Sequence, residues 1–443
     1  MKCGHFGAMN QQPMAELSRN PPSDVRTPRL SARASEMNDM VRVSAAGDSD
    51  AVSALKSGLP RGRDLRLDLF RGLANWAIFL DHIPNNAVAW LTTRNYGFSD
   101  AADIFVFISG YTAAFVYGRR MNRQGFVAGT ALLFRRVWQL YVAHVLLFVF
   151  YAASIGYVAQ RYGHSHLLDE FNVSGLIEKP VATLSQGLTL AFKPLNLDVL
   201  PLYIVLMAAF PPMLWSMMRF PTAALAASTG MYLLARHYGW NLPAYPSGGW
   251  YFNPFAWQFL FAIGAWAALG GAEKTASVRR TPAVLIASAA FLAFALAVTL
   301  AGRFDWLGSS FPPELLALFE PNDKTNLAPY RILHFVALSV LVVRFVPADG
   351  ALLRARALRP AIICGERSLE VFCVGIFLSF VGHFVLEIYY DGLIGQVAVS
   401  AGGIAILTLV AAYRSWSRTL DRQPKPRSAS ARGGGSNEME SLR

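Results

Sequence analysis

The sequence predicts an all-α integral membrane protein, a bundle of about ten transmembrane helices. Its 443 residues are 54% apolar, and its mean hydropathy of +0.34 is high for a soluble protein of this length. Apolar stretches near the ~20 residues that a helix needs to cross the hydrocarbon recur along the chain. Many of the basic residues behind the net charge of +12 lie in short loops between these stretches. That distribution indicates membrane topology rather than nucleic-acid binding, so no nucleic-acid partner is expected.

The candidate spans alternate with two kinds of loop. The loops at 119–136, 271–280 and 344–367 are rich in arginine, whereas the intervening loops are mixed or nearly uncharged. The positive-inside rule therefore predicts that the arginine-rich loops and both termini are cytoplasmic. Ten segments have the length and apolar character of spans: 67–90, 101–118, 136–158, 199–218, 221–237, 252–270, 282–301, 327–346, 368–389 and 393–413.

The spans form one membrane domain between two polar ends. Residues 63–415 contain all the apolar stretches, whereas 1–62 and 416–443 are polar and lack apolar periodicity. Such segments bury too little apolar surface to fold, so both are predicted to be disordered cytoplasmic tails. The three cysteines have neither the spacing of a metal site nor that of a disulfide framework.

The first span, "LDLFRGLANWAIFLDHIPNN" (67–86), carries charge that hydrocarbon would not tolerate unpaired. At about 100° per residue, Asp68, Arg71, Asn75, His82 and Asn86 fall within ~60° of one another on a helix. They form a polar stripe that must face the bundle interior. Charged residues inside a membrane usually mark function, so this stripe is a candidate site.

His82 is the candidate base within the stripe. A neutral histidine takes a proton from a hydroxyl when its second ring nitrogen is held by an acceptor, and Asp103, Asp198 or Glu387 is a candidate for that acceptor. Asp81 points about 100° away from His82 on a helix, so it is not automatically its partner. The alternative is a histidine that only bridges two helices through hydrogen bonds.

Polar residues of several other spans lie at the same outer level as His82 in this topology. Because independent surface residues would not share one depth, a common polar cavity is expected. Its expected members beyond the first span are Asp100, Asp103, Asp198, Asn253, Arg331, His334, His383 and Glu387.

Several further motifs are candidates for a binding or a structural role. Arg135 and Arg136 suit phosphate recognition at the cytoplasmic mouth of the third span, or only anchor the topology. Trp250 and its aromatic neighbours stack on a sugar, or belong to an interfacial belt. In "HSH" (164–166), two histidines without an obvious third ligand are weak evidence, so no metal is expected. Ser109 and Gly110 permit close helix packing, and Ser99 or Asp100 suits a helix cap.

Six motifs together resemble the OpgC family of bacterial inner-membrane proteins, which succinylate osmoregulated periplasmic glucans. They occur in order between about residues 63 and 413: "LDLFRGL…DHIPNN", "NYGFSDAADIFVFISGY", "RRVWQLYVAH", "LDVLPLYIVL", "GGWYFNPFAWQFLF" and "CGERSLEVFCVGIF". The resemblance extends to the wider group of acyltransferase-3-like membrane acyltransferases. It implies a multi-pass protein of the bacterial inner membrane.

The resemblance also implies an O-acyltransferase reaction. The acyl group, a succinyl group in this family, moves from cytoplasmic acyl-CoA to a hydroxyl of a periplasmic glucan, with acyl-CoA as co-substrate and no other cofactor. The family's catalytic histidine, preceded by an arginine, corresponds to His82 and Arg71. His82 then acts as general base or as a transient acyl carrier. Arg71, Asn75 or Arg331 would steady the oxyanion, and Arg331 or His334 would alternatively recognise the donor carboxylate.

A proton-coupled transporter of a small anionic or sugar-like solute is the alternative function. Ten helices with buried ionisable groups are also typical of such transporters. The sequence contains no clear inverted repeat to favour one. Hydrolysis of a CoA thioester by the purified protein separates the two, because only an acyltransferase is expected to show it.

Overall fold

The computed structural model describes residues 64–348 and 350–420, and these residues are mostly helical without a β-strand. The predicted tail at 1–62 lies outside them, as do residues 421–443. Helix α18 (Leu393–Leu420) continues beyond the predicted end of the last span at 413, into the expected C-terminal tail.

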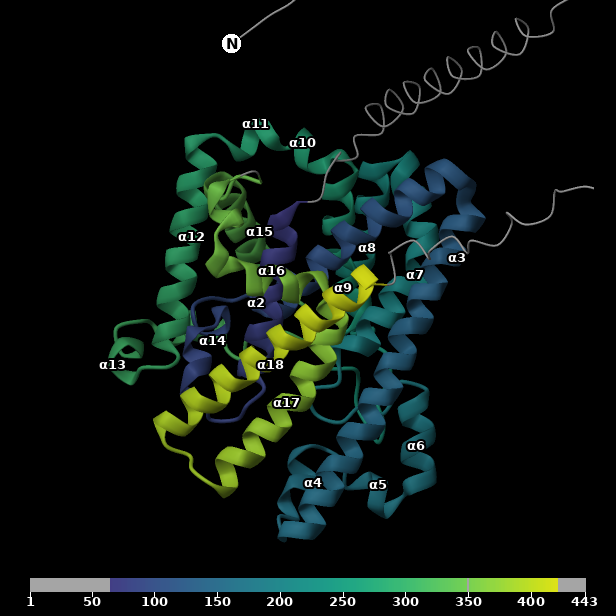
Figure 1. Ribbon diagram of the computed structural model, residues 1–443. Helices are drawn as coiled ribbons and strands as arrows, with labels where there is room; N and C mark the ends of the chain where they lie inside the picture. The colour runs from purple at the N-terminus through teal and green to yellow at the C-terminus, as the bar shows by residue number, and fades with distance from the viewer. Residues whose placement is uncertain (1–63, 349, 421–443) are drawn as a thin grey trace, which may run out of the picture. The chain divides into compact units, whose positions relative to one another are not determined.

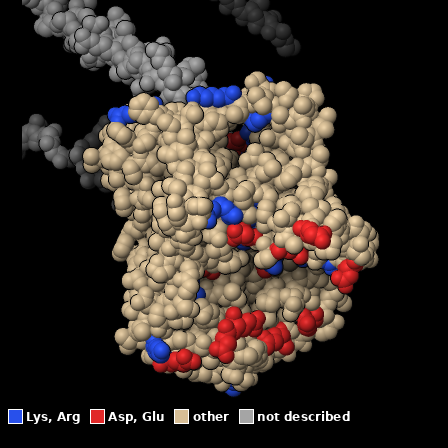
Figure 2. All heavy atoms as spheres, turned by 180° about the vertical axis from the view of Figure 1, so that it is seen from behind, with Lys and Arg blue, Asp and Glu red and all other residues tan. Residues whose placement is uncertain are grey.

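On the face shown in Figure 2, Lys and Arg gather at the upper end, whereas Asp and Glu predominate over the lower half.

Each predicted span coincides with a helix (Figure 1). Six helical segments are long and apolar enough to cross a membrane, which is consistent with a multi-pass membrane protein. They are 101–162, 199–219, 254–274, 282–301, 368–388 and 393–420. The helices at the positions of the ten predicted spans are α2 (Leu65–Asp81), α3 (Ala101–Tyr162), α7 (Val199–Arg219), α8 (Pro221–Tyr238), α9 (Pro254–Trp266), α12 (Pro282–Ala301), α15 (Pro329–Phe345), α17 (Ser368–Ile388) and α18.

The predicted loop at 119–136 is wrong, because these residues are helical on both sides of a kink at Gly125. The second and third predicted spans are the two limbs of α3, which bends sharply in Figure 1. The bend is at Gly125, where φ is 84° and ψ is 169°. Only glycine adopts that conformation without a steric penalty, so one residue turns the chain where a loop was expected.

The first span is shorter than predicted. Helix α2 has 17 residues, about 25 Å at 1.5 Å per residue, and His82 is its C-cap. The chain continues in two 3₁₀ turns, η1 (Ala87–Leu91) and η2 (Thr93–Asn95). Asn86 therefore lies beyond the helix and outside the polar stripe, where its amide nitrogen donates to Ser400 Oγ at 3.1 Å.

Shorter helices fill the connections. After α3 come α4 (His166–Glu170), α5 (Gly175–Glu178) and α6 (Pro180–Leu188), which precede the segment leading to α7. Helices α13 (Asp305–Gly308) and α14 (Pro313–Ala317) lie between α12 and α15, and α16 (Arg359–Glu366) precedes α17.

Two pairs of helices cross with their backbones in close approach at glycines. A Cβ on Gly72 of α2 would collide with the backbone of Ala361 in α16, and one on Gly365 would collide with Asp68. In the same way, Gly110 of α3 faces Phe261 of α9, and Gly264 faces Phe107. Small residues drive such packing in membranes because they let backbones touch, which confirms the packing role predicted for Gly110.

Gly110→Ala should destabilise the fold by about 1–3 kcal/mol, because the added methyl group forces α3 and α9 apart. Gly402→Ala is the matched control, because nothing lies within 4 Å of the Cβ position at Gly402. Alanine is the better helix former, so the control should be neutral or slightly stabilising. Thermal unfolding in detergent compares the two variants. Equal melting temperatures would contradict the close packing of α3 against α9 at Gly110.

Candidate active site

A cavity of about 750 Å³ opens where several segments distant in sequence converge. The end of α2 and the start of α3 form part of its wall, and residues 191–199 and 244–252 form another part. Its volume is in the range of small-molecule sites. The charged or titratable residues of the lining are Asp81, His82, Arg94, Asp100, Lys193, Asp198, Arg303, Lys324 and Arg331.

His82 lies in this wall with one ring nitrogen engaged and one available. Its Nδ1 lies 2.5 Å from the carbonyl oxygen of Ile78, which fixes Nδ1 as the donor. The lone pair is then on Nε2, for which the described residues supply no hydrogen-bond partner. The orienting acceptor is thus a backbone carbonyl of α2 itself. None of the predicted carboxylates, Asp103, Asp198 or Glu387, takes that role.

Asp81 also lines the cavity but is already engaged. Its Oδ1 accepts a hydrogen bond from Thr92 Oγ1 at 2.7 Å, and Arg94 donates to its backbone carbonyl at 3.2 Å. These contacts tie the end of α2 to the 3₁₀ turns that follow. Asp81 therefore shapes the wall beside His82 and makes no hydrogen bond to the imidazole.

A buried ionic network lies against this cavity. Arg331 of α15 is 2% exposed and donates to Asp103 Oδ2 at 2.6 Å. It also contacts Asp100 at 3.3 Å, and Lys324 reaches the same Asp100 oxygen at 2.7 Å. Asp100 and Asp103 form the capping box of α3, as expected for Asp100. Asp103 is fully buried behind the wall, so it holds Arg331 rather than facing a ligand.

Lys193 and Asp198 lie in the segment between α6 and α7. The Lys193 ammonium is 3.9 Å from the centroid of the Trp250 ring and donates to Leu190 O at 3.1 Å. Burial lowers the pKa of Lys193 to about 8, and burial raises the pKa of Asp198 to about 6. Trp250 does not line the cavity, and Lys193 covers a face of its indole. Its neighbours Tyr251 and Phe252 do line the cavity, as do Phe98 and Tyr245.

The lining cations outnumber the carboxylates, five to three, so the cavity suits a negatively charged ligand. Sequence reasoning missed Arg94, Lys193, Arg303 and Lys324. The sequence did contain a signal for these four residues. Each is a basic residue in a connection that the predicted topology places outside, where the positive-inside rule makes basic residues less frequent. A basic residue in such a loop is more informative than one in an arginine-rich cytoplasmic loop.

A second cavity, about 150 Å³, is bordered by one residue of the α2 stripe. Arg71 lines it and donates to Thr112 Oγ1 at 2.9 Å, and Arg136 borders the same space. Arg135 is exposed instead. Asn75, one turn beyond Arg71 toward His82, is 2% exposed, and its amide has no hydrogen-bond partner among the described residues. Asp68 is buried near the start of α2.

Besides Asp103, four residues predicted for the common cavity lie elsewhere. Asn253 is the N-cap of α9, and its amide donates to Trp240 O and Asn326 Oδ1. His334 is buried, with Nδ1 2.7 Å from Ser99 Oγ, behind the wall at Gly97. His383 and Glu387 lie near the end of α17 among the histidines that follow α3. A shared depth in the membrane did not place them in one cavity, because the helices lie at different lateral positions.

Arg331→Met should destabilise the protein by about 3–5 kcal/mol, because it leaves Asp103 buried without its cation. Arg331→Met combined with Asp103→Leu should recover part of that loss, since the double variant removes both charges. A double-mutant cycle from unfolding in detergent measures the coupling. Equal destabilisation in the single and double variants would contradict a coupled pair.

A comparison with known families agrees with the sequence motifs. The model of the OpgC protein family matches residues 63–419 of this chain. Searches of curated proteins and of solved structures found no match. The family match includes α2 with His82, both cavities and the ionic network, and it covers well over half of the chain. The chain therefore belongs to the OpgC family.

Proposed function

We propose that this protein transfers a succinyl group from cytoplasmic succinyl-CoA to hydroxyls of a periplasmic glucan. Membership of the OpgC family suggests an acyltransferase that modifies glucans. The main support for the site is the environment of the His82 imidazole. Its Nδ1 is held by Ile78 O, and its Nε2 remains available in a charged cavity. The proposal includes an inner-membrane location with both termini cytoplasmic and the cavity on the periplasmic side.

In the proposed reaction, His82 Nε2 takes the proton of a glucan hydroxyl as that oxygen attacks the thioester carbonyl. The new C–O bond forms, the C–S bond breaks, and the imidazolium returns the proton to the departing thiolate of CoA. His82 is the C-cap of α2, and the partial negative charge at a helix C-terminus favours the imidazolium that forms on the way.

The donor would reach His82 along α2. Arg136 and Arg71 at the smaller cavity suit the anionic, polar end of an acyl-CoA. From Arg71 to His82 is about 16 Å along the helix at 1.5 Å per residue. The unpartnered amide of Asn75 lies between them and would hydrogen-bond the amides of the pantetheine arm or the thioester oxygen. Asp68 lies farther along the same helix and completes the stripe.

The free carboxylate of the succinyl group accounts for the excess of cations. Arg331, the predicted partner of that carboxylate, is held by Asp100 and Asp103, and His334 lies behind the wall. Lys193, Arg94 and Arg303 line the cavity without a carboxylate partner among the described salt bridges. We assign recognition of the succinyl carboxylate to these three residues. An acetyl donor would leave them without a partner.

His82→Ala should lower kcat by about 100-fold or more, as loss of a positioned base does. His82→Gln keeps hydrogen-bonding capacity and should fold normally without regaining turnover. The measurement is the succinyl content of periplasmic glucan, by mass spectrometry, in cells that express each variant at matched protein level. His237→Ala is the matched control, because His237 is exposed at the end of α8. Normal succinylation in His82→Ala cells would exclude His82 from the mechanism.

Slow hydrolysis of succinyl-CoA by the purified protein, absent in His82→Ala, would distinguish an acyltransferase from the transporter alternative. A transporter has no reason to cleave the thioester, so complete absence of hydrolysis together with unchanged glucan would favour transport.

The KM for succinyl-CoA should rise about tenfold between pH 7 and pH 9, because Lys193, with a pKa of about 8, loses its charge over that interval. Below pH 7 the ammonium is almost entirely protonated, so this contribution to the KM changes little there. Lys193→Arg keeps its charge and should flatten the pH profile, whereas Lys193→Gln should have the raised KM at every pH. Coincident profiles for the natural protein and Lys193→Arg would contradict the assignment.

A further inference from the structure

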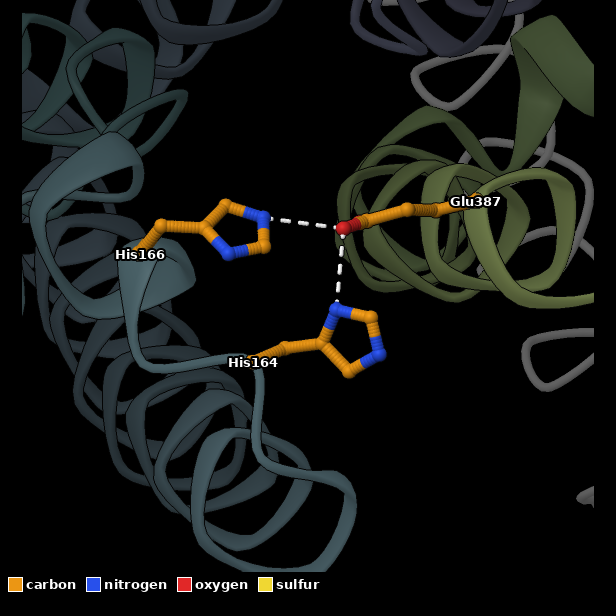
Figure 3. A group of neighbouring side chains, drawn as sticks. All are labelled: His164, His166 and Glu387. Carbon is orange, nitrogen blue, oxygen red and sulfur yellow. Dashed lines mark hydrogen bonds and ion pairs between the residues drawn. The ribbon is translucent and has the colours of Figure 1, made fainter.

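A cluster of three histidines and two glutamates lies apart from the active-site cavity. His164 and His166 follow the end of α3, Glu170 ends α4, and His383 and Glu387 face them from α17. Figure 3 shows His164 and His166 both pointing toward the Glu387 carboxylate. His164 Nδ1 lies 3.1 Å from Glu387 Oε1, and His166 Nε2 lies 2.8 Å from the same oxygen.

This arrangement matches the ligand set of a transition-metal site. The three ligand atoms lie within 4.8 Å of one another. With Zn–N and Zn–O bonds of about 2.0–2.2 Å, the edges of a tetrahedral site are about 3.4 Å. Around a shared ion, His164 Nδ1 would lie about 0.3 Å and His166 Nε2 about 0.6 Å farther from Glu387 Oε1. The ligand atoms of the two histidines, which lie within 4.8 Å of each other, would be separated by about the same edge. Two histidines and one glutamate are also a known zinc ligand set.

His383 supplies a second, independent observation. Its Nε2 is buried and makes no hydrogen bond within the described chain. It lies 3.5 Å from Glu387 Oε2 and 3.4 Å from Glu170 Oε1. An imidazole nitrogen without a hydrogen bond, directed at two carboxylates, is placed to orient Glu387 from beside the ion.

We propose that His164 Nδ1, His166 Nε2 and the Glu387 carboxylate bind one Zn²⁺ ion, with His383 beside it. The ligands come from segments more than 200 residues apart, so the ion would join the end of α3 to the end of α17. Phe171 packs on the His383 ring at 5.7 Å, and the next residue, Asn172, lines the active-site cavity. The site would therefore brace one wall of that cavity. Its role is structural and is independent of the acyl-transfer proposal.

The test uses tag-free, full-length protein in detergent, stripped with a chelator and dialysed against a Zn²⁺ series. Bound zinc, measured by mass spectrometry of the metal, should saturate at one ion per chain. Zinc should also raise the melting temperature by a few degrees, because it binds the folded state alone. His164→Ala combined with His166→Ala should weaken zinc binding by about 100-fold or more, since loss of even an outer partner of a ligand weakens it 10–100-fold.

Two further variants separate a metal site from a purely hydrogen-bonded cluster. Glu387→Gln retains an acceptor oxygen for the histidines but removes the charged ligand, so it should lose zinc while the zinc-free protein keeps its melting temperature. His237→Ala, exposed on α8, should bind zinc as the natural protein does. The His166 side chain is 58% exposed, so its removal should disturb the fold little. If the double variant does not fold, His166→Ala alone tests the loss of a zinc ligand. Binding below one zinc per chain, or equal affinity in the ligand variants, would overturn the proposal.

Discussion

The buried pairing of Arg331 with Asp103 and Asp100 is the constraint on which the active-site cavity depends. A guanidinium that is 2% exposed is stable only where carboxylates compensate its charge, so α15 and the start of α3 must meet at this point. Lys324 extends the network to the segment before α15 through the same Asp100 oxygen. The start of α3 and residues 324–331, which are distant in sequence, are thereby held around one space, and His82 at the end of α2 opens into it.

The place where α2 ends is as important as the residues that it carries. Because the helix stops at Asp81, His82 is a cap whose Nδ1 binds the Ile78 carbonyl of the last turn. The same carbonyl also accepts the backbone N–H of His82 at 3.2 Å, so it holds both the backbone and the ring of this residue. The second lone pair of this carbonyl thus selects the tautomer and leaves Nε2 for chemistry.

The connections between helices contribute as much to the site as the helices do. Arg94, Lys193, Arg303 and Lys324 all come from connecting segments and give the cavity its excess of positive charge. Loops between membrane helices are free to carry charge because water reaches them, whereas the bundle itself must stay apolar or paired. In this chain the charged wall of the cavity and the His164–His166–Glu387 cluster therefore both lie where helices end.

The sequence by itself determined whatever depends on neighbours along the chain. Apolar length predicted the helices, and the spacing of Asp68, Arg71 and Asn75 predicted a polar face on α2. The cap at Asp100 and the close packing at Gly110 were likewise readable from local residue types, and the motifs indicated the family. Only the tertiary structure decided the partners: Asp103 with Arg331, Asp100 with Lys324, and Glu387 with His164 and His166. Depth in a membrane follows from sequence position, but lateral position follows from side-chain packing and charge pairing between distant segments. For that reason His383 and Glu387 lie outside the cavity, although sequence placed them at its level.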